Sequence, residues 1–120
     1  MIHHAALEVR EDEADADVAF WGLLGFAEVG PSPALARRAR WLERGGTQIH
    51  LLFTEEPLSA AEGHVAVIAP AFEETLAALR GAGHAPEPRT EHWGSPRAFV
   101  RTPSGHRVEL MAFPPDSALE

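Results

Sequence analysis

The sequence predicts an α+β fold made of two copies of one β-α-β-β-β unit. In each half, a run of alternating apolar and polar residues is followed by apolar residues at helical spacing and then by further strand-like runs. Corresponding landmarks recur at nearly constant separations: His4 and His64 lie 60 residues apart, Gly25 and Gly83 lie 58 apart, and His50 and Glu109 lie 59 apart. A repeat of this length indicates a duplicated unit whose copies pack against each other or against a second chain.

The first half begins with a strand and a helix. Apolar and polar residues alternate from Ile2 to Val9, and the acidic stretch EDEADAD then starts a helix that Gly25 ends. Phe20 and Trp21 are expected to pack this helix into the core. Three short strands are expected to follow, over 26–29, 38–43 and 47–53, with a Gly-Gly hairpin between the last two.

The second half repeats this order. The segment GHVAVIA alternates as a strand, and Phe72, Leu76 and Leu79 then fall at helical spacing before a glycine-rich end. Strands are expected over 85–89, at a sheet edge because of its two prolines, and over 97–101 and 107–113. The chain is interpreted as one domain, with module one at 1–56, a connecting segment at 57–62, module two at 63–115 and a tail at 116–120.

Composition narrows the classes of function. The chain has 120 residues, a net charge of −8 at pH 7, ten arginines, and no lysine or cysteine. We therefore expect no nucleic-acid partner and no membrane partner, and the lack of cysteine excludes disulfides and thiolate metal sites. The basic segment 37–44 is interpreted as charged protection of a strand edge. Neither an export signal nor an 18-residue apolar stretch is visible, so the cytoplasm is the expected location.

Four polar residues share one kind of position in the expected strands. Because side chains alternate between the two faces of a strand, each of them lies opposite the apolar side of its own strand. They are His4, His50, His64 and Glu109. Imidazoles and a carboxylate suit zinc, nickel, manganese, cobalt or ferrous iron. The alternative for any single histidine is a surface or hydrogen-bonded role, but the equivalent placement of all four favours a shared metal site.

Several stretches in order resemble one known family. HHAALEV, AFWGLLGF, GTQIHLL, GHVAVI, LRGAGHAPEP and WGSPRAFVRTPSGHRVEL are similar to successive signatures of the vicinal oxygen chelate superfamily. This superfamily includes glyoxalase I, the fosfomycin-resistance thiol transferases, bleomycin-resistance proteins and extradiol dioxygenases. The resemblance covers nearly the whole chain. It implies two βαβββ modules that form a curved mixed sheet around a cleft, and a homodimer in which paired modules come from one chain or from two.

The resemblance also implies roles for individual residues. His4 matches the ligand on the first strand, His64 its counterpart in the second module and Glu109 the carboxylate of the last strand, which is the set used by the resistance transferases. His50 stands where glyoxalase I has a glutamate, and this departure argues against the standard glutathione hemithioacetal isomerase. His50 is then either a fourth ligand or the general base, and His50 and Glu109 are the catalytic candidates. His3 is the rival of His4 and is expected on the apolar side of its strand.

Three residues near the expected cleft are candidates for substrate binding. Trp93 suits stacking on a substrate, Arg97 suits pairing with a carboxylate or phosphonate, and Phe99 shares the face of Arg97 and suits a pocket wall. Each has a structural alternative: Trp93 as a loop anchor, Arg97 as an exposed strand charge and Phe99 as simple packing.

These observations predict a metal-dependent enzyme that acts on a small oxygen-rich substrate. A divalent metal with open positions would chelate two neighbouring oxygens and stabilise negative charge, which fits a lyase, an isomerase or a transferase. Extradiol ring cleavage fits less well, because those relatives resemble longer chains. The alternative is a non-catalytic protein that sequesters a small molecule or antibiotic, as in the bleomycin-resistance branch. No phosphate-binding, Ser-His-Asp or dinucleotide motif is present.

Overall fold

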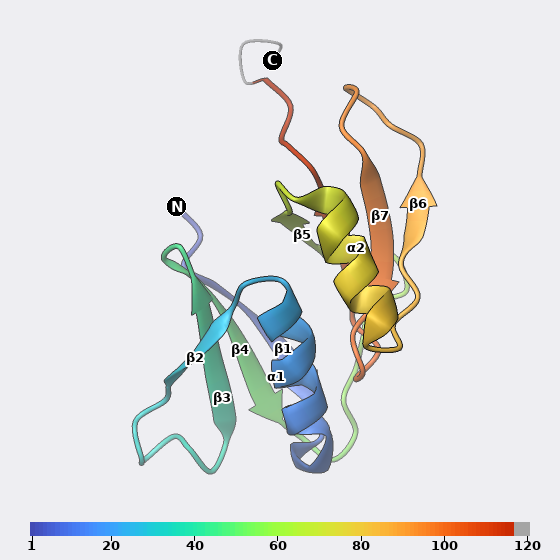
Figure 1. Cartoon of the computed structure of the whole chain (residues 1–120). Coiled ribbons are helices and arrows are strands. Elements are labelled where there is room, and N and C mark those ends of the chain that lie inside the picture. Colours follow the sequence, from blue (N-terminus) through green and yellow to red (C-terminus); the bar gives the residue numbers. More distant parts are fainter. Residues whose placement is uncertain (117–120) are drawn as a thin grey trace.

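The computed structural model describes residues 1–116, and its elements follow the expected order. The first module contains β1 (His4–Val9), a short 3-10 helix η1 (Glu11–Glu13), α1 (Ala14–Leu23), β2 (Ala27–Gly30), β3 (Ala39–Arg44) and β4 (Thr47–Phe53). The second contains β5 (Val65–Ile68), α2 (Phe72–Gly81), β6 (Glu87–Arg89), β7 (Arg97–Arg101) and β8 (Arg107–Met111). Figure 1 shows the two modules side by side, each with its own helix.

Both modules have the same sheet topology. The strand order is β1-β4-β3-β2 in the first sheet and β5-β8-β7-β6 in the second. In each sheet the first strand pairs in parallel with the last, and the other neighbouring strands pair antiparallel. The α+β class and the two βαβββ units are therefore confirmed, in the form of two four-stranded mixed sheets. The exact limits assigned to the two modules and their connection stay a prediction.

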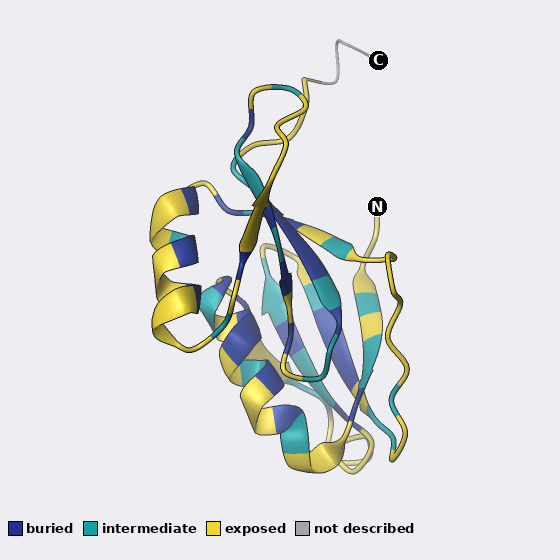
Figure 2. Cartoon of the chain, turned by 90° about the vertical axis from the view of Figure 1, so that its right-hand side faces the viewer, coloured by how far each residue is buried: buried dark blue, intermediate teal, exposed yellow. Residues whose placement is uncertain are grey.

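The two helices lie on the same side of the sheets (Figure 2). Phe20 and Trp21 of α1 and Leu79 of α2 are fully buried, and they belong to one cluster with strand residues of both modules, such as Leu51 and Leu110. The strand residues that alternate with this cluster therefore point to the face that the helices leave open. Each helix has ten residues, and within residues 1–116 none is long and apolar enough to cross a membrane.

Two strands are shorter than their alternation suggests. β1 begins at His4, two residues after its expected start, and β8 ends at Met111, two residues before its expected end. Each strand stops where its paired residues stop: His4 pairs with Gln48, and Met111 pairs with Arg97. The alternation of apolar and polar residues indicates which face of a strand is apolar, whereas the length of the strand depends on how many of its residues pair with the neighbouring strand. Of the expected tail, residues 117–120 lie outside the described part of the chain.

The basic segment 37–44 does not protect a sheet edge, so that interpretation is wrong. β3 pairs with β2 on one side and with β4 on the other. Arg40 forms ion pairs with Glu28 of β2 and with Asp15 of α1, and Arg44 donates a hydrogen bond to the backbone oxygen of Leu24. These arginines hold β3 to its neighbours. Alternation within one strand carries no information on how many partners that strand has.

Polar contacts join the two modules near the turn between β7 and β8. Asp17 is fully buried in α1, and its carboxylate accepts hydrogen bonds from the hydroxyl and the backbone N–H of Ser104 in that turn. His106 contacts the backbone oxygen of Glu8 at the end of β1 through Nε2, at 2.6 Å. Its backbone N–H also donates to the hydroxyl of Thr102 within the turn. These contacts fix the turn of the second module against the first.

Replacing Asp17 with alanine should lower the free energy of unfolding by about 1.5–3 kcal/mol, because Ser104 loses a charged hydrogen-bond acceptor inside the protein. Urea unfolding measures this loss. Ser104→Ala supplies the matched partner for a double-mutant cycle, and the two losses should be less than additive. Fully additive losses would show that the two side chains do not stabilise each other.

Candidate metal centre

His4 and His50 lie next to each other on the open face of the first sheet. They come from the neighbouring strands β1 and β4, and their rings are stacked with centroids 3.9 Å apart and planes 12° apart. Trp41 of β3 covers the other face of the His50 ring, with centroids 4.3 Å apart and planes 7° apart. His50 is therefore held between two flat rings and is only 7% exposed, whereas His4 is exposed.

A hydrogen-bond chain fixes the tautomer of His50. The side-chain nitrogen of Gln48 donates to the Glu43 carboxylate at 3.0 Å, so the amide oxygen of Gln48 is the atom that faces Nε2 of His50, at 2.7 Å. Because that oxygen can only accept, Nε2 carries the hydrogen. A neutral His50 then has its lone pair on Nδ1. Metal-binding histidines are commonly oriented in this way, by an acceptor on the nitrogen that does not bind the metal.

The surroundings of His50 keep its imidazole neutral. Burial lowers the pKa of His50 below its ordinary value of 6.5, and the charges that His4 and His3 acquire on protonation lower it further. A neutral imidazole at neutral pH is the form that binds a metal ion or accepts a proton. His50 thus has the protonation state that either of its expected roles requires.

His3 does not lie on the apolar side of β1, where the sequence placed it. Its Nδ1 is 2.9 Å from Nδ1 of His4, and its ring centroid is 6.2 Å from that of His50. The reason is that β1 begins at His4, so the alternation of the strand does not extend to the residue before it. His3 therefore belongs to the candidate site, in contrast to its predicted position.

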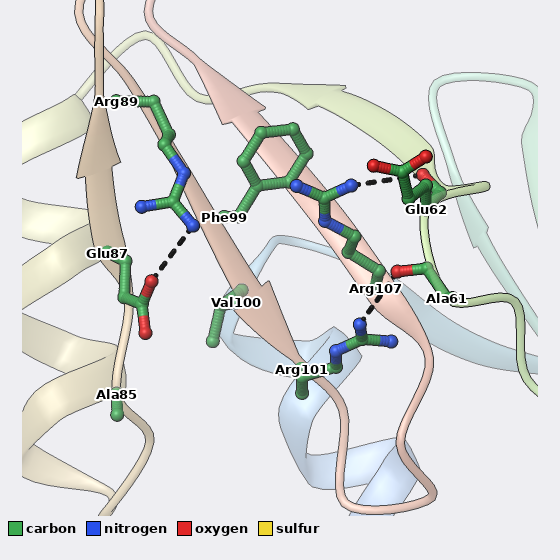
Figure 3. A pocket seen from close by; sticks show the side chains of 9 residues that line it. All are labelled: Ala61, Glu62, Ala85, Glu87, Arg89, Phe99, Val100, Arg101 and Arg107. Atoms are coloured by element: carbon green, nitrogen blue, oxygen red, sulfur yellow. Dashed lines mark hydrogen bonds and ion pairs between the residues drawn. The ribbon is translucent and has the colours of Figure 1, made fainter.

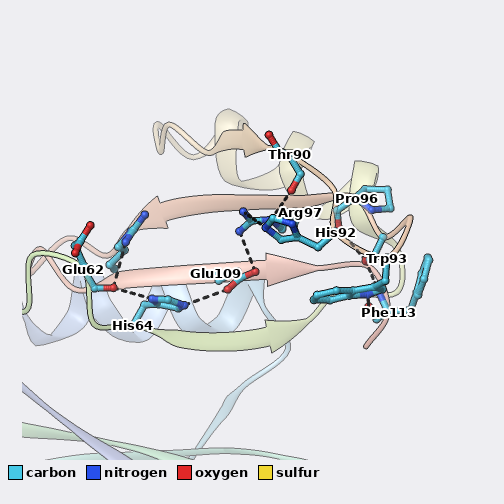
Figure 4. Close-up of polar contacts among 11 residues, drawn as sticks. Glu62, His64, Thr90, His92, Trp93, Pro96, Arg97, Glu109 and Phe113 are labelled. Atoms are coloured by element: carbon cyan, nitrogen blue, oxygen red, sulfur yellow. Dashed lines mark hydrogen bonds and ion pairs between the residues drawn. The ribbon is translucent and has the colours of Figure 1, made fainter. Parts of the chain in front are cut away.

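His64 and Glu109 form the second pair, on the open face of the second sheet (Figure 4). Nδ1 of His64 lies 2.8 Å from the backbone oxygen of Glu62, and Nε2 lies 3.1 Å from Oε1 of Glu109. Since the backbone oxygen can only accept, Nδ1 carries a hydrogen, and the lone pair of a neutral ring on Nε2 faces the carboxylate. Two acceptors at this distance require a proton or a cation between them. Glu109, 8% exposed, is therefore arranged to share a positive charge with His64.

Three contacts hold the guanidinium of Arg97, and one of them is to Glu109 of the candidate site. One guanidinium nitrogen donates to Oε2 of Glu109 at 3.3 Å, Nε donates to the backbone oxygen of Thr90 at 2.6 Å, and the third nitrogen contacts the His92 ring at 3.0 Å. Trp93 donates from Nε1 to the backbone oxygen of Phe113 at 2.9 Å, as a loop anchor would. Substrate binding by Arg97 and Trp93 stays a prediction.

Phe99 lies at the centre of a basic surface on the second sheet. The His64 ring meets it edge to face with centroids 5.0 Å apart, and the guanidinium of Arg107 stands 3.7 Å from the centre of the Phe99 ring. Phe99, Arg107 and Arg89 line a pocket of about 310 Å³, together with Glu62 and other residues (Figure 3). Phe99 thus lines a pocket, and its contact with a substrate stays a prediction.

Within one chain, the four expected ligands lie in two pairs. His4 is stacked on His50, and His64 contacts Glu109. In the described part of the chain, the group of three or more metal-binding side chains whose ligand atoms all lie within 4.8 Å of one another is His3, His4 and His50. The single chain therefore does not gather the four expected residues around one point.

The site residues predicted from the sequence do not include those that orient His50 and His64. Alternation placed Gln48 on the same face as His50, and this was a usable signal. The contribution of Glu43 could be found only with the pairing of β3 and β4, which puts Glu43 opposite Gln48. The backbone oxygen of Glu62 has no signal in the sequence, because any residue there offers the same atom.

Both pairs fit a divalent transition metal by the chemistry of their donors. A neutral His64 ring presents its Nε2 lone pair to the Glu109 carboxylate, and a neutral His50 ring has its lone pair on Nδ1, beside two further imidazoles. Neutral imidazole and carboxylate are the donors that zinc, nickel, cobalt and ferrous iron accept.

The comparisons with known proteins agree with this fold. A family model described as the Glyoxalase/Bleomycin resistance protein/Dioxygenase superfamily matches residues 1–110. The chain therefore belongs to this superfamily, as the sequence signatures suggested. A comparison with curated protein sequences found no match.

Solved structures with the same fold come from proteins of several activities. A glyoxalase family protein from Bacillus anthracis has a TM-score of 0.83 at 23% identity, covering 92% of this chain and 93% of that one. The fosfomycin resistance protein FosX from Listeria monocytogenes has a TM-score of 0.78 at 15% identity, covering 99% and 94%. A lactoylglutathione lyase from Agrobacterium tumefaciens has a TM-score of 0.70 at 20% identity, covering 92% of each chain. At these identities the similarity shows the fold alone.

Stability at mildly acidic pH should reveal the lowered pKa of His50. As pH falls below about 6.5, the unfolded chain takes up a proton at His50 before the folded chain does, so the contribution of His50 to stability is present above that pH and is lost below it. Urea unfolding with a chelator present, at about pH 7.5, 6.5 and 5.5, measures the loss. The His50→Gln variant should lose less stability over this range than the wild type, and an equal loss would contradict the lowered pKa.

Proposed function

We propose that this protein is a metal-dependent enzyme that acts on a small oxygen-rich substrate, as a lyase, an isomerase or a transferase. The metal is zinc, nickel, iron, manganese or cobalt, and its ligands are His4, His64 and Glu109, with His50 as a fourth ligand or as the general base. The observation that carries this proposal is the contact between Nε2 of His64 and the carboxylate of Glu109, 3.1 Å apart, with Nδ1 of His64 held by the backbone oxygen of Glu62. The match of His4, His64 and Glu109 to ligand positions of this superfamily, as the resemblance implies, agrees with the proposal.

A second copy of the chain would bring the two pairs together. Each pair lies on the open face of its own sheet, and the residues beside them on β1 and β5, Ala6 and Ala66, are exposed in the single chain. The resemblance to the vicinal oxygen chelate superfamily implies a homodimer with paired modules. We therefore propose a homodimer in which the first module of one chain faces the second module of its partner. The expected cytoplasmic location is part of this proposal and stays a prediction.

The residues of the chain divide the chemical work between them. A divalent ion held by the histidines and Glu109 would act as a Lewis acid for two neighbouring substrate oxygens. If His50 stays off the metal, its Nδ1 accepts a proton from the substrate, and the amide oxygen of Gln48 then stabilises the imidazolium through the hydrogen on Nε2. The Glu43 carboxylate behind Gln48 adds negative charge to this chain of contacts. Arg97 keeps the Glu109 carboxylate in position through Oε2.

Metal analysis tests the ligand set directly. Protein purified without a polyhistidine tag should bind one divalent ion per chain, and His64→Ala or Glu109→Ala should lower the affinity at least about tenfold because each removes a donor. Glu87→Ala, on β6 of the same sheet, is the matched control and should leave the affinity unchanged, since Glu87 pairs with Arg89 and not with the site. Unchanged affinity after loss of Glu109 would show that Glu109 is not a ligand, whereas a wild type that binds no metal would favour the sequestering alternative, in which a small molecule binds without metal.

Mixing two inactive variants tests whether the site is shared between chains. His4→Ala and Glu109→Ala dimers should each be inactive, but mixed dimers contain one intact site, so re-equilibrated mixtures should regain about a quarter of the wild-type activity. The assay uses α-keto hemithioacetals, epoxides and catechols as substrates with metal present. His4→Ala mixed with His50→Ala is the control, because both changes fall in the same half of the site and leave no mixed dimer intact. No recovery in the first mixture would show that each site is built within one chain.

A further inference from the structure

We propose that His3, His4 and His50 form a metal site within one chain, which binds zinc, cobalt(II), nickel or copper(II) without His64 or Glu109. This site includes His3, which has no place in the ligand set proposed above. It deepens the proposed function, because the ion could bind to the first module of one chain before His64 and Glu109 of a second copy complete the site. It does not require that function, because three imidazoles suffice to hold an ion of this kind.

The spacing of the ring nitrogens supports a shared ion. The ligand atoms of the three histidines all lie within 4.8 Å of one another. Nδ1 of His3 and Nδ1 of His4 are 2.9 Å apart. With zinc–nitrogen bonds of about 2.0–2.1 Å, two ligands at right angles are about 2.9 Å apart, and two tetrahedral ligands about 3.4 Å. Two of the three donors therefore already stand at the separation that one ion imposes.

The three histidines combine one fixed ligand with two mobile ones. The His50 ring is stacked on Trp41, and the amide oxygen of Gln48 occupies its Nε2. Its Nδ1 is the remaining donor. His3 and His4 are exposed, so their side chains are free to turn and close the remaining distance to an ion bound at His50. A rigid first ligand reduces the ordering that metal binding costs.

The donor set decides which ions fit. Three neutral imidazoles with no carboxylate suit zinc, cobalt(II), nickel and copper(II), whereas magnesium and calcium prefer oxygen ligands. Three protein ligands also leave a coordination position open for water or for a further side chain. The alternative to a metal is a hydrogen bond between the two Nδ1 atoms, with one ring donating; this contact gives no affinity for ions, so a binding measurement separates the two.

The test uses the full chain without a polyhistidine tag, titrated with Co²⁺ and followed by visible absorption and calorimetry. The double variant His64→Ala/Glu109→Ala should still bind one Co²⁺ per chain, with affinity reduced by no more than about a hundredfold. Adding His3→Ala should lower the affinity at least about tenfold further. Adding His92→Ala instead is the matched control and should change nothing, because His92 contacts Arg97 on the other module. Magnesium should not compete.

Circular dichroism checks that each variant folds. His3→Asn is a second variant at the same position and keeps a polar side chain there. If the wild type binds Co²⁺ and the double variant does not, the three-histidine site is overturned while the proposed function stands. If the double variant binds Co²⁺ equally tightly after His3→Ala or His3→Asn is added to it, His3 is not a ligand and the proposal fails. If the double variant binds as tightly as the wild type, the three-histidine site survives and the proposed ligand set fails.

Discussion

The covering of each sheet by a helix on one face only is the constraint on which the rest of the structure depends. Side chains in a strand alternate between two faces, so once Leu51 and Leu110 enter the core, their neighbours His50 and Glu109 must point to the open face. The same alternation orients β1 and its parallel partner β4. A polar pair on the open face of each sheet is thus a consequence of packing the core, repeated because the unit is duplicated.

His50 and His64 are oriented in the same way: one ring nitrogen of each faces a fixed hydrogen-bond acceptor. In the first module the acceptor is the amide oxygen of Gln48, and in the second it is the backbone oxygen of Glu62. Each acceptor takes an N–H and leaves the other nitrogen of a neutral ring with a lone pair. The two halves use different atoms for this purpose, so duplication preserved the geometry of the module and not the identity of the supporting residue.

The electrostatic setting of the two pairs differs, although the backbone is the same. Arg97 and Arg107 surround the second pair with positive charge, and Arg97 contacts Glu109 directly. His50 of the first pair is instead buried between the rings of His4 and Trp41. An anionic substrate group would accordingly meet a favourable potential on the second sheet. The first sheet instead offers the lone pair on Nδ1 of a neutral His50, which suits a metal ion or a proton.

The sequence by itself determined the order of the elements, their duplication and the face to which each strand residue points, because these depend on local alternation and on helical spacing. It also selected His4, His50, His64 and Glu109 as one class of position. Only the tertiary structure decided which of them touch, since contact depends on pairing between strands and on the arrangement of the modules. It also placed His3 beside His4, outside the alternation of β1, where no periodic rule applies.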